Sequence, residues 1–275
     1  MNATQEPLVS VLICAYRAAP FIAATLKSVC AQTYSRLEIL VLDNHSQDDT
    51  VAVVGGLAAQ DPRIRLFKST ENLGPYGGLN NLLERAQGSF LAIQDHDDLW
   101  HPDKLAAQMA FLTRRPDRIG CGAAMLNHYE KYDRFLLRRQ APESTIAWHT
   151  SLVFRRGPAR YDPHLKVGAD FHFMRHALCG GQPRIHNLPA PYVLRRIHAD
   201  GRNLSSHWIK AGNGRAILTA PIGWLDKLCL LNRLLLSSAR MDRLVLGLFP
   251  RRRVLTRADL AADPLLKHFV TGLAL

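Results

Sequence analysis

A short acidic segment, Gln94-Asp95-His96-Asp97-Asp98, directly follows the apolar run Ser89-Phe90-Leu91-Ala92-Ile93. In an extended backbone, residues i and i+2 point to the same side, so Asp95 and Asp97 can converge on one cation or one polar ligand. Hard divalent ions such as Mg²⁺ and Mn²⁺ prefer carboxylate oxygens and often share them with substrate phosphates. The segment therefore predicts a metal–diphosphate site.

The alternative is that these acids cap the helix that follows. We assign this capping or supporting role to Asp98, which faces the other way, and give His96 no chemical role. For Asp95 and Asp97 we favour the site, because the acidic pair ends an otherwise apolar strand.

Asp43 also ends an apolar strand. Its carboxylate could accept hydrogen bonds from the imide N–H of a uracil-like base or from a ribose hydroxyl, with Asn44 in support. The alternative is an Asx-type turn into the next helix. We expect Ser46 to cap that helix, which would leave Asp43 free for a ligand.

The elements that must position these side chains alternate between strands and helices. Apolar runs predict strands at Val9–Ile13, Leu37–Leu42, Arg63–Phe67 and Phe90–Gln94, and helical spacing predicts helices at Phe21–Val29, from Ser46 towards Gln60, and at Leu79–Ala86. Four βα units indicate a Rossmann-like, mainly parallel sheet flanked by helices, which binds ligands beyond the carboxyl ends of its strands. Three polar loops would meet at that edge.

The second half predicts a mixed arrangement. We expect helices at Pro102–Thr113 and Ala169–Leu178, and strands at Ile119–Tyr129, Arg134–Leu137, Ile146–Arg155 and Tyr192–Ile197. This pattern predicts one large domain over residues 1–200, with an alternating first half (1–100) and a mixed second half (101–200), followed by a tail at residues 201–275.

Several other patterns give weaker signals. The glycine-rich loop Asn72–Gly78 matches no P-loop or dinucleotide fingerprint, although its backbone could approach a ligand closely. His172 and His176 have a zinc-like spacing, but Phe173 stands where a metalloprotease needs glutamate, so ordinary packed or surface histidines are the expectation. Cys14 and Cys179 are interpreted as small core residues.

Composition limits the class of protein. The 275 residues are 47% hydrophobic, which favours one large folded domain with an appendage. The five cysteines are scattered without a CxxC pair, and the first residues resemble no signal peptide, so we expect a reduced, cytoplasmic setting. No apolar run is long enough to span a membrane.

The net charge of +12 is unevenly distributed. Residues 201–275 hold twelve Lys or Arg and four Asp, a net charge of +8. Leucine-rich stretches around Trp224 and at Leu228–Leu236 predict amphipathic basic helices, which could lie on the anionic inner face of the plasma membrane as a peripheral contact or could pack on the catalytic domain. No nucleic-acid-binding motif is present, and we expect no nucleic acid as partner.

Four segments together resemble the family 2 glycosyltransferases of the GT-A fold. They are Val9–Arg17, Val41–Thr50, Glu71–Gly74 and Gln94–Asp98, and their order and spacing match over roughly residues 8–200. The resemblance implies a site for a nucleotide-diphosphate sugar and a divalent metal, Mn²⁺ or Mg²⁺. It also implies that the fold is of the GT-A type, with a catalytic domain at residues 1–200 and a C-terminal helical extension at residues 201–275. Within that domain, residues 1–100 would be the nucleotide-sugar-binding half and residues 101–200 the acceptor-binding half.

The resemblance assigns roles to individual residues. The nucleotide-sugar would be held by Ala15, Tyr16, Asp43, Asn44, Asn72 and Asp95. Asp97 would bind the metal, and His198 of the closing Arg195–His198 segment would complete the metal shell or contact the diphosphate. Asp170 would be the general base, with an N-cap role as the alternative. Asn44 and His45 replace the commoner Asp and Gly, and Ala169 replaces the acid that usually precedes the base.

These roles predict an inverting, metal-dependent hexosyltransferase. It would move a sugar from a UDP- or dTDP-sugar to a hydroxyl of a glycan or lipid-linked glycan, in bacterial cell-surface polysaccharide synthesis. The competing hypothesis is a non-catalytic basic module that binds membrane or nucleic acid on a GT-A scaffold; it draws on the pI of about 9.9.

Overall fold

The computed structural model describes residues 6–165, 168–199, 223–224, 227–228, 231 and 254–273. The first half of the chain forms the predicted alternation of strands and helices. Its elements are β1 (Val9–Ala15), α1 (Ile22–Cys30), β2 (Leu37–Asp43), α2 (Thr50–Ala58), β3 (Ile64–Lys68), α3 (Gly74–Arg85) and β4 (Phe90–Ile93). β4, β1, β2 and β3 pair in parallel in this order, so their carboxyl ends share one edge.

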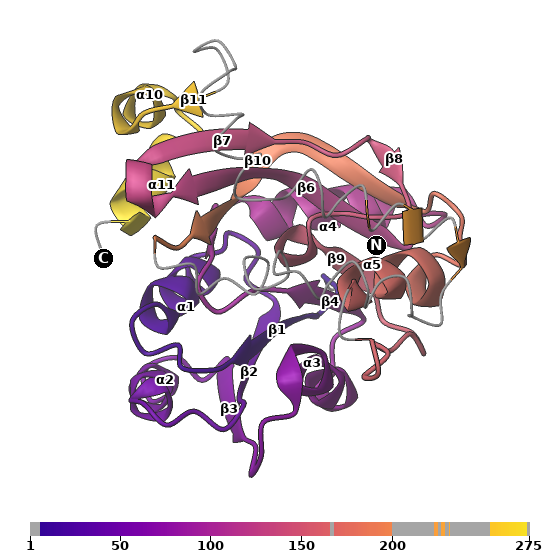
Figure 1. The fold of residues 1–275 in the computed structure, drawn as a ribbon, viewed down its shortest axis with the longest axis horizontal. Helices are drawn as coiled ribbons and strands as arrows, with labels where there is room; N and C mark the ends of the chain where they lie inside the picture. The colour runs from indigo at the N-terminus through magenta and orange to yellow at the C-terminus, as the bar shows by residue number, and fades with distance from the viewer. Residues whose placement is uncertain are drawn as a thin grey trace, which may run out of the picture.

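The second half extends the same sheet with mixed strand directions (Figure 1). Its elements are β5 (Leu99–Trp100), α4 (Lys104–Arg114), β6 (Gly120–Tyr129), η1 (Glu130–Tyr132), β7 (Arg134–Arg138), β8 (Glu143–Ser144), η2 (His149–Ser151), β9 (Val153–Arg155), α5 (Ala169–His172), η3 (Phe173–Leu178) and β10 (Ile185–Ile197). The main path of the sheet runs β11-β7-β6-β9-β4-β1-β2-β3, and β10 pairs in parallel with β6. This confirms the predicted α/β architecture, in which a parallel half of the sheet is continued by a mixed half.

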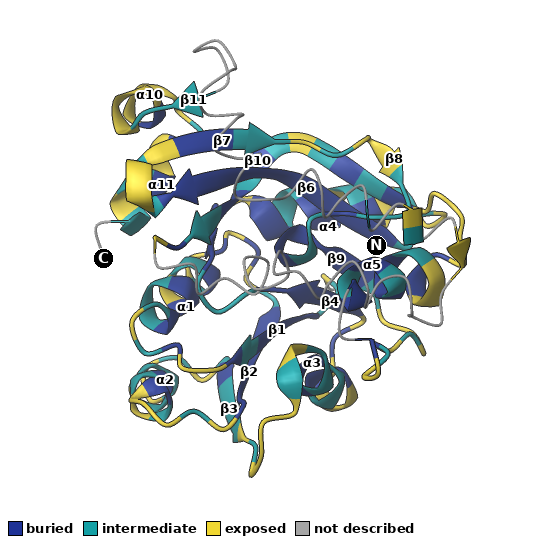
Figure 2. Cartoon of the chain, in the orientation of Figure 1, coloured by how far each residue is buried: buried dark blue, intermediate teal, exposed yellow. Residues whose placement is uncertain are grey.

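Alternating side chains of β1 divide the core into two layers. Val9, Val11 and Ile13 pack with α1, α2 and α4 on one face, whereas Leu12 packs with α3 and η3 on the other. Both layers are buried, and Figure 2 shows the central strands in the colour of buried residues. A sheet covered on both faces leaves its edges and loops for ligands.

Two helices begin elsewhere than the sequence predicts. α2 begins at Thr50, and the side chain of Ser46 does not cap it; Ser46 Oγ instead accepts a hydrogen bond from the N–H of Arg17 at 2.9 Å. α3 begins at Gly74, so the glycine-rich segment is its first turn. A Cβ on Gly78 would overlap Cys14 Sγ, which means that the close backbone approach is to β1.

The strand predicted at Ile146–Arg155 is shorter than expected. Its first part includes the single turn η2, and β9 covers only Val153–Arg155. β10 is correspondingly longer than the predicted Tyr192–Ile197 and runs from Ile185. Its two irregular positions flank Pro191, since proline has no N–H to donate to a ladder.

The end of the chain packs on the catalytic domain. β11 (Val254–Leu255) pairs with β7, and α10 (Arg257–Ala262) and α11 (Lys267–Leu273) follow. Leu260, Leu266 and Phe269 form a small core with residues of β5, β6, β7 and β10. Residues 254–273 pack on the sheet, whereas the predicted amphipathic stretches around Trp224 and at 228–236 lie mostly outside the described residues. None of the helices described is long and apolar enough to cross a membrane.

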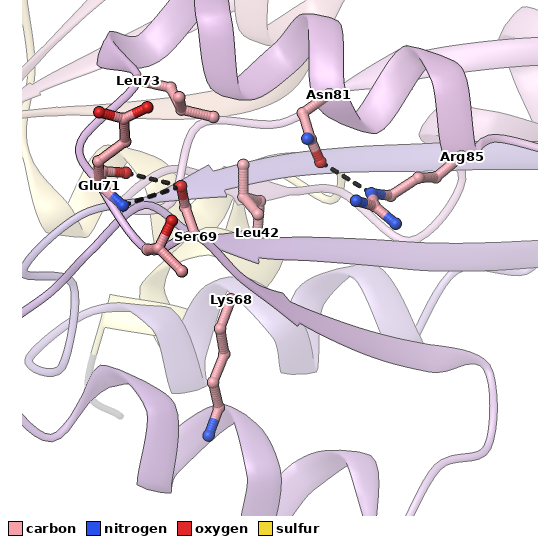
Figure 3. Close-up of a pocket in the computed structure, with 8 residues that line it drawn as sticks. Leu42, Lys68, Ser69, Glu71, Leu73, Asn81 and Arg85 are labelled. Atoms are coloured by element: carbon pink, nitrogen blue, oxygen red, sulfur yellow. Dashed lines mark hydrogen bonds between the residues drawn. The ribbon is translucent and has the colours of Figure 1, made fainter.

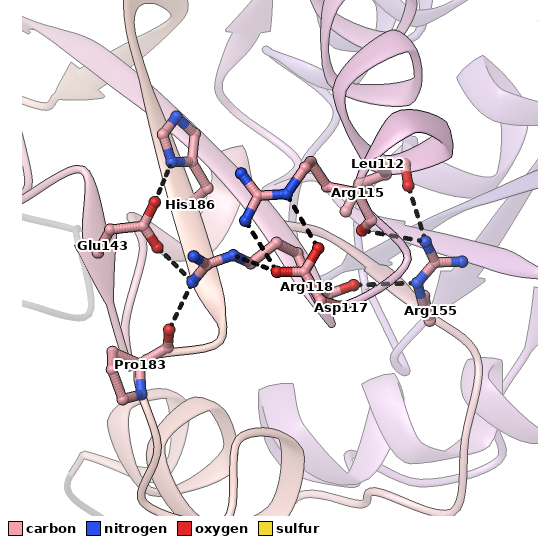
Figure 4. A network of polar contacts seen from close by, with 8 residues as sticks. All are labelled: Leu112, Arg115, Asp117, Arg118, Glu143, Arg155, Pro183 and His186. Atoms are coloured by element: carbon pink, nitrogen blue, oxygen red, sulfur yellow. Dashed lines mark hydrogen bonds and ion pairs between the residues drawn. The ribbon is translucent and has the colours of Figure 1, made fainter.

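A polar network ties the amino ends of β6 and β10 to α4 (Figure 4). Arg118 pairs with Glu143, and Glu143 Oε1 lies 2.8 Å from Nδ1 of His186. Arg155 donates to the carbonyl of Leu112 at the end of α4. The network lies at the amino end of β10, and the acidic segment lies near its carboxyl end.

Candidate active site

One carboxylate oxygen of Asp43 is engaged by a turn, and the other has no hydrogen-bond partner among the described residues. The residue is the last of β2 and only 4% exposed. Its Oδ2 accepts the N–H of Ser46 at 3.3 Å, which is the Asx-type turn. Its Oδ1 is buried and has no hydrogen-bond partner among the described residues. Because a buried carboxylate oxygen without a donor costs free energy, this atom points to a missing donor.

The loops after β1 and β2 are held together at the same edge. The N–H of Asn44 donates to the carbonyl of Ala15 at 2.8 Å. Tyr16 follows with 37% of its surface exposed. Arg17 and His45 both adopt left-handed φ angles, 50° and 66°, which non-glycine residues rarely do. Strain at two adjacent loops is typical of a binding edge.

Asn44 and Asn72 hold the next loop in place. Asn44 Nδ2 donates to Asn72 Oδ1 at 3.1 Å and to the Gly74 carbonyl at 3.0 Å, while its Oδ1 accepts the N–H of Leu73 at 2.9 Å. Asn72 Oδ1 also accepts the N–H of Gly74. Both amides are therefore engaged with backbone, which shapes the loop beside Asp43.

Asp97 and His198 meet at the carboxyl end of β10. Oδ2 of Asp97 lies 2.8 Å from Nε2 of His198, and Nδ1 of His198 lies 3.1 Å from Oε2 of Glu130. Burial lowers the pKa of His198, but the hydrogen bond and charge of Asp97 and the charge of Glu130 outweigh burial and raise it. For Asp97, burial raises the pKa, but the bond from His198 and the nearby positive charges lower it overall.

Asp98 supports the site but caps no helix. α4 begins later, after Asp103. Asp98 is 1% exposed and its Oδ1 accepts the N–H of Arg196 at 3.0 Å, which joins the acidic segment to β10. Burial, then the charges of Asp97 and Asp95, raise the pKa of Asp98 well above its usual range. The predicted capping role is wrong, and the bond to Arg196 is compatible with the alternative, a supporting role.

The Asp97–His198 pair could hold a divalent cation if the cation replaced the proton of the hydrogen bond that joins the two side chains. Ligands in adjacent octahedral positions at about 2.1 Å from Mg²⁺ lie about 3 Å apart, close to the 2.8 Å between Oδ2 and Nε2. Glu130 holds the other imidazole nitrogen, as the outer partner of a metal-bound histidine does. No group of three or more His, Cys, Asp or Glu among the described residues could hold a metal ion. A cation held by this pair would take its remaining ligands from water or from substrate phosphates.

The charges of Asp95 and Asp170 both act on one buried phenol, that of Tyr161. Oδ1 of Asp95 is 3.8 Å from Nδ1 of His149, whose Nε2 is 2.7 Å from the hydroxyl of Tyr161. Burial, then the charges of Tyr76, Asp170 and Asp95, raise the pKa of Tyr161. Asp170 is thus near the acidic segment, although 75 positions separate it from Asp95 in the sequence.

The helix of Asp170 is short and irregular. Its N-cap is Gly168, with a left-handed φ of 70°, so Asp170 lies in the first turn and is not the N-cap. The π-helical segment η3 follows at once, and such segments are frequent at functional sites. Phe173 of η3 stacks on Tyr161 at 4.0 Å between ring centroids, which fixes the helix against the site.

Three residues near the site have no signal in the sequence motifs. Glu130, His149 and Tyr161 contact predicted site residues or lie beside them, but they come from η1, η2 and a loop. The parallel pairing of β6 with β10, with Tyr129 opposite Ile197, brings Glu130 near residue 198. The strands predicted in these segments were the one feature of the sequence that indicated where these residues lie in the fold.

The weaker sequence patterns have structural explanations. The rings of His172 and His176 are 5.0 Å apart on one helical face. Burial raises the pKa of the Cys14 thiol to about 12 and that of Cys179 to about 11, so neither is an activated nucleophile. Both cysteines pack in the core beside α3 and η3, as predicted.

A pocket of about 250 Å³ lies between the loop after β3 and α3 (Figure 3). Leu42, Lys68, Ser69, Thr70, Glu71, Leu73, Asn81 and Arg85 line it. Arg85 Nε is held by Asn81 Oδ1 at 2.8 Å. None of the predicted donor or metal residues lines this pocket, so the candidate site is defined by its polar side chains instead.

Comparisons with known proteins identify glycosyltransferases among the relatives of this chain. Two Escherichia coli relatives are described as UDP-Glc:alpha-D-GlcNAc-diphosphoundecaprenol beta-1,3-glucosyltransferases, WfaP and WfgD. They are 36% and 37% identical over 38% and 39% of this chain. The chain spans only 41% and 42% of their lengths.

Solved structures share the fold. TarS of S. aureus, in complex with UDP-GlcNAc, matches 88% of this chain and 76% of its own with a TM-score of 0.61 and 19% identity. A mannosyltransferase of Pyrobaculum calidifontis, in complex with GDP-Man and Mn²⁺, matches 98% of this chain and 85% of its own with a TM-score of 0.59 and 21% identity. The sequence model of glycosyl transferase family 2 matches residues 10–177, more than half of the chain. The protein therefore belongs to glycosyl transferase family 2.

Proposed function

We propose that this protein is an inverting, metal-dependent glycosyltransferase that moves a sugar from a UDP- or dTDP-sugar to a hydroxyl of a glycan or lipid-linked glycan. The observation that carries the proposal is that Asp43 and the acidic segment, with Asp97 in contact with His198, lie at the carboxyl ends of the parallel strands β2 and β4. A base contact, a diphosphate contact and a proton acceptor are the three groups that such a transfer needs.

Asp43 would recognise the base of the donor. Its buried Oδ1 can accept the imide N–H of uracil or thymine. Cytosine has no N–H at that ring position, so a CDP- or CMP-sugar would leave the oxygen unpaired. Ala15, Tyr16, Asn44 and Asn72 would complete the base and ribose site, with Tyr16 offering an exposed ring.

Asp97 and His198 would hold the divalent metal, Mn²⁺ or Mg²⁺, and Asp95 would contact the ribose or the sugar. When bound, the metal neutralises the charge that develops on the departing diphosphate. The buried carboxylate of Asp98 ties this segment to Arg196 and keeps Asp97 in place. The protein's own contribution is thus a rigid pair of ligands at the end of β10.

Asp170 would act as the general base. It takes the proton from the acceptor hydroxyl while the oxygen of that hydroxyl attacks the anomeric carbon. The bond from that carbon to the diphosphate oxygen breaks, and the nucleoside diphosphate leaves on the opposite face. One displacement inverts the anomeric configuration.

A lipid-linked acceptor is supported by the two E. coli relatives, whose names specify a diphosphoundecaprenol acceptor. The net charge of +8 in residues 201–275 would favour peripheral contact with the anionic inner face of the plasma membrane, in bacterial cell-surface polysaccharide synthesis. Binding to anionic vesicles at low salt tests this contact. Full-length protein that never sediments with such vesicles contradicts it.

The decisive experiment is a screen of UDP-, dTDP- and GDP-sugars for slow, metal-dependent hydrolysis, which identifies the donor without the acceptor. We expect release of nucleoside diphosphate from one UDP- or dTDP-sugar with Mn²⁺, and none from Asp97→Asn. An enzyme that hydrolyses no nucleotide sugar and whose melting temperature ignores every nucleotide would refute the proposal.

A further inference from the structure

Glu130 lies outside every motif of the sequence, yet it touches the histidine of the proposed metal pair. Its Oε2 is 3.1 Å from Nδ1 of His198, and the other ring nitrogen faces Asp97. The side chain of His198 is 3% exposed, and its ring contacts that of Phe21 at 4.6 Å between centroids, with the ring planes tilted by 38°. Glu130 therefore helps to fix which nitrogen of the ring faces Asp97.

The turn that carries Glu130 is closed by Asp133. Glu130 begins η1, which connects β6 to β7, and the N–H of Asp133 donates to the Glu130 carbonyl at 3.3 Å. Asp133 has a left-handed φ of 44°, a conformation that Asp tolerates better than most residues. Its Oδ1 contacts Nε2 of His128 at 3.0 Å. The turn is thus held from the β6 side.

The end of the chain holds the same turn from outside. Arg257 Nε donates to Asp133 Oδ2 at 2.7 Å across 124 positions of sequence. Arg257 is placed there because β11 pairs with β7, with Val254 opposite Leu136 and Leu255 opposite Phe135. Thr256, which lies between Leu255 and Arg257, caps α10: its side chain accepts the N–H of Asp259, and the side chain of Asp259 accepts the N–H of Thr256. The position of Arg257 is therefore defined on both sides.

We infer that Glu130 is a positioning residue for His198, and that the C-terminal segment, through Arg257 and Asp133, fixes the turn that carries Glu130. The inference rests on the proposed function in one respect, that His198 binds the metal. Carboxylates behind a metal-bound histidine set its ring orientation and basicity, and their loss typically weakens metal binding about 10- to 100-fold. The segment beyond residue 253 would then act on the active site without touching substrate.

The first test measures Mn²⁺ affinity in the presence of UDP by electron paramagnetic resonance. Glu130→Gln keeps the side-chain shape but removes the charge, and we expect about tenfold weaker Mn²⁺ binding. The matched control is Glu143→Gln, because Glu143 makes the same contact with His186 at the amino end of β10. We expect this control to bind Mn²⁺ as the wild type does.

The second test concerns the C-terminal segment. Arg257→Gln and Asp133→Asn should weaken Mn²⁺ binding in the same direction as Glu130→Gln, by a smaller factor, and Arg257→Lys should restore part of it. Arg115→Gln, which removes the exposed pair with Asp117, is the control for loss of a surface ion pair. Equal Mn²⁺ affinity in wild type, Arg257→Gln and Asp133→Asn would overturn the part of the inference that concerns Arg257.

A metal-free measurement separates the two proposals. A double-mutant cycle of Glu130→Gln and His198→Gln, read as the urea midpoint without metal, should show non-additive effects. Additive effects, or Mn²⁺ affinity that is equal in wild type and Glu130→Gln, would overturn the inference alone. Wild-type protein that binds no Mn²⁺ with any nucleotide would overturn the metal site of the proposed function, and the inference with it.

Discussion

Asp97 and His198 are joined by a 2.8 Å contact although 101 positions separate them in the chain. β10 creates this relationship, because it pairs in parallel with β6 and antiparallel with β5, the short strand directly after the acidic segment. His198, which follows β10, therefore lies beside the acidic segment, which precedes β5. The pair is a product of topology, and its chemistry can be tested directly.

Replacing Asp97 by Asn should remove the part of UDP stabilisation that depends on Mn²⁺. A ligand at 100 times its Kd stabilises the native state by about 2.7 kcal/mol, which is read as a rise in melting temperature. Wild-type protein should show a larger rise with UDP and Mn²⁺ than with UDP alone, and the variant should show the same rise in both. An undiminished Mn²⁺ effect in Asp97→Asn would contradict the assignment.

Asp43→Asn should weaken UDP binding by roughly 10- to 100-fold, since hydrogen bonds to charged groups contribute about 1.5–3 kcal/mol. Isothermal titration calorimetry with UDP measures the change. Asp49→Asn is the matched control, because Asp49 is exposed at the start of α2 and makes no side-chain capping bond. Similar UDP affinity in both variants would count against a base contact at Asp43.

Asp170→Asn should lower kcat about 10²- to 10⁴-fold with little change in UDP affinity, because a general base acts on the acceptor and not on the nucleotide. Turnover with the donor and acceptor, beside calorimetry with UDP, separates the two effects. A variant with normal kcat would exclude Asp170 as the base.

Lys104→Met should stabilise the protein at neutral pH by about 1–3 kcal/mol. Lys104 is fully buried, its Nζ has no hydrogen-bond partner among the described residues, and burial lowers its pKa well below 10.5. The Trp100 ring at 3.7 Å favours the charged amine, but burial is the larger effect.

The gain from this substitution should depend on pH. Between the folded pKa of Lys104 and 10.5 the unfolded chain binds more protons, so this residue makes wild-type stability rise with pH. The advantage of Lys104→Met should therefore be largest at low pH and shrink as the pH approaches 10.5. Urea denaturation of both proteins from pH 6 to 10 checks this, and a difference independent of pH would show that Lys104 is charged in the fold.

Gly78→Ala should destabilise the fold by about 1–3 kcal/mol, the usual cost of an overpacked core. The added methyl group would overlap the Cys14 sulfur. In a Cys14→Ala background the same change should cost much less, and urea midpoints of the four proteins give the coupling. Equal costs in both backgrounds would mean that another neighbour limits Gly78.

Local pattern was enough to predict the four parallel strands. β1, β2 and β4 are almost wholly buried, so their apolar runs identify them without knowledge of partners. α3 was predicted five residues too short at its start, because Gly77 and Gly78 disfavour a helix in isolation. Contact with Cys14 overrides that preference, and such a contact is not visible in the sequence.

The candidate site, too, could be predicted from the sequence only in part. Asp43 and Asp97 follow strands, so the position of each at the sheet edge could be predicted. The contacts of Glu130 with His198 and of His149 with Tyr161 join segments that no motif connects. The prediction that Ser46 caps α2 failed because Arg17, from the neighbouring loop, uses its hydroxyl.

The two-residue strand β11 has a consequence for how the purified protein behaves in solution. β7 is covered by β6 on one side and by β11 on the other, so the pairing hides hydrogen-bonding groups that another chain could use. At the opposite edge, β3 instead presents charged side chains, Arg65 and Lys68 among them, which discourage pairing. Protein shortened before Val254 should therefore aggregate through β7 during purification, and any loss of its activity would have to be measured on the monomeric fraction.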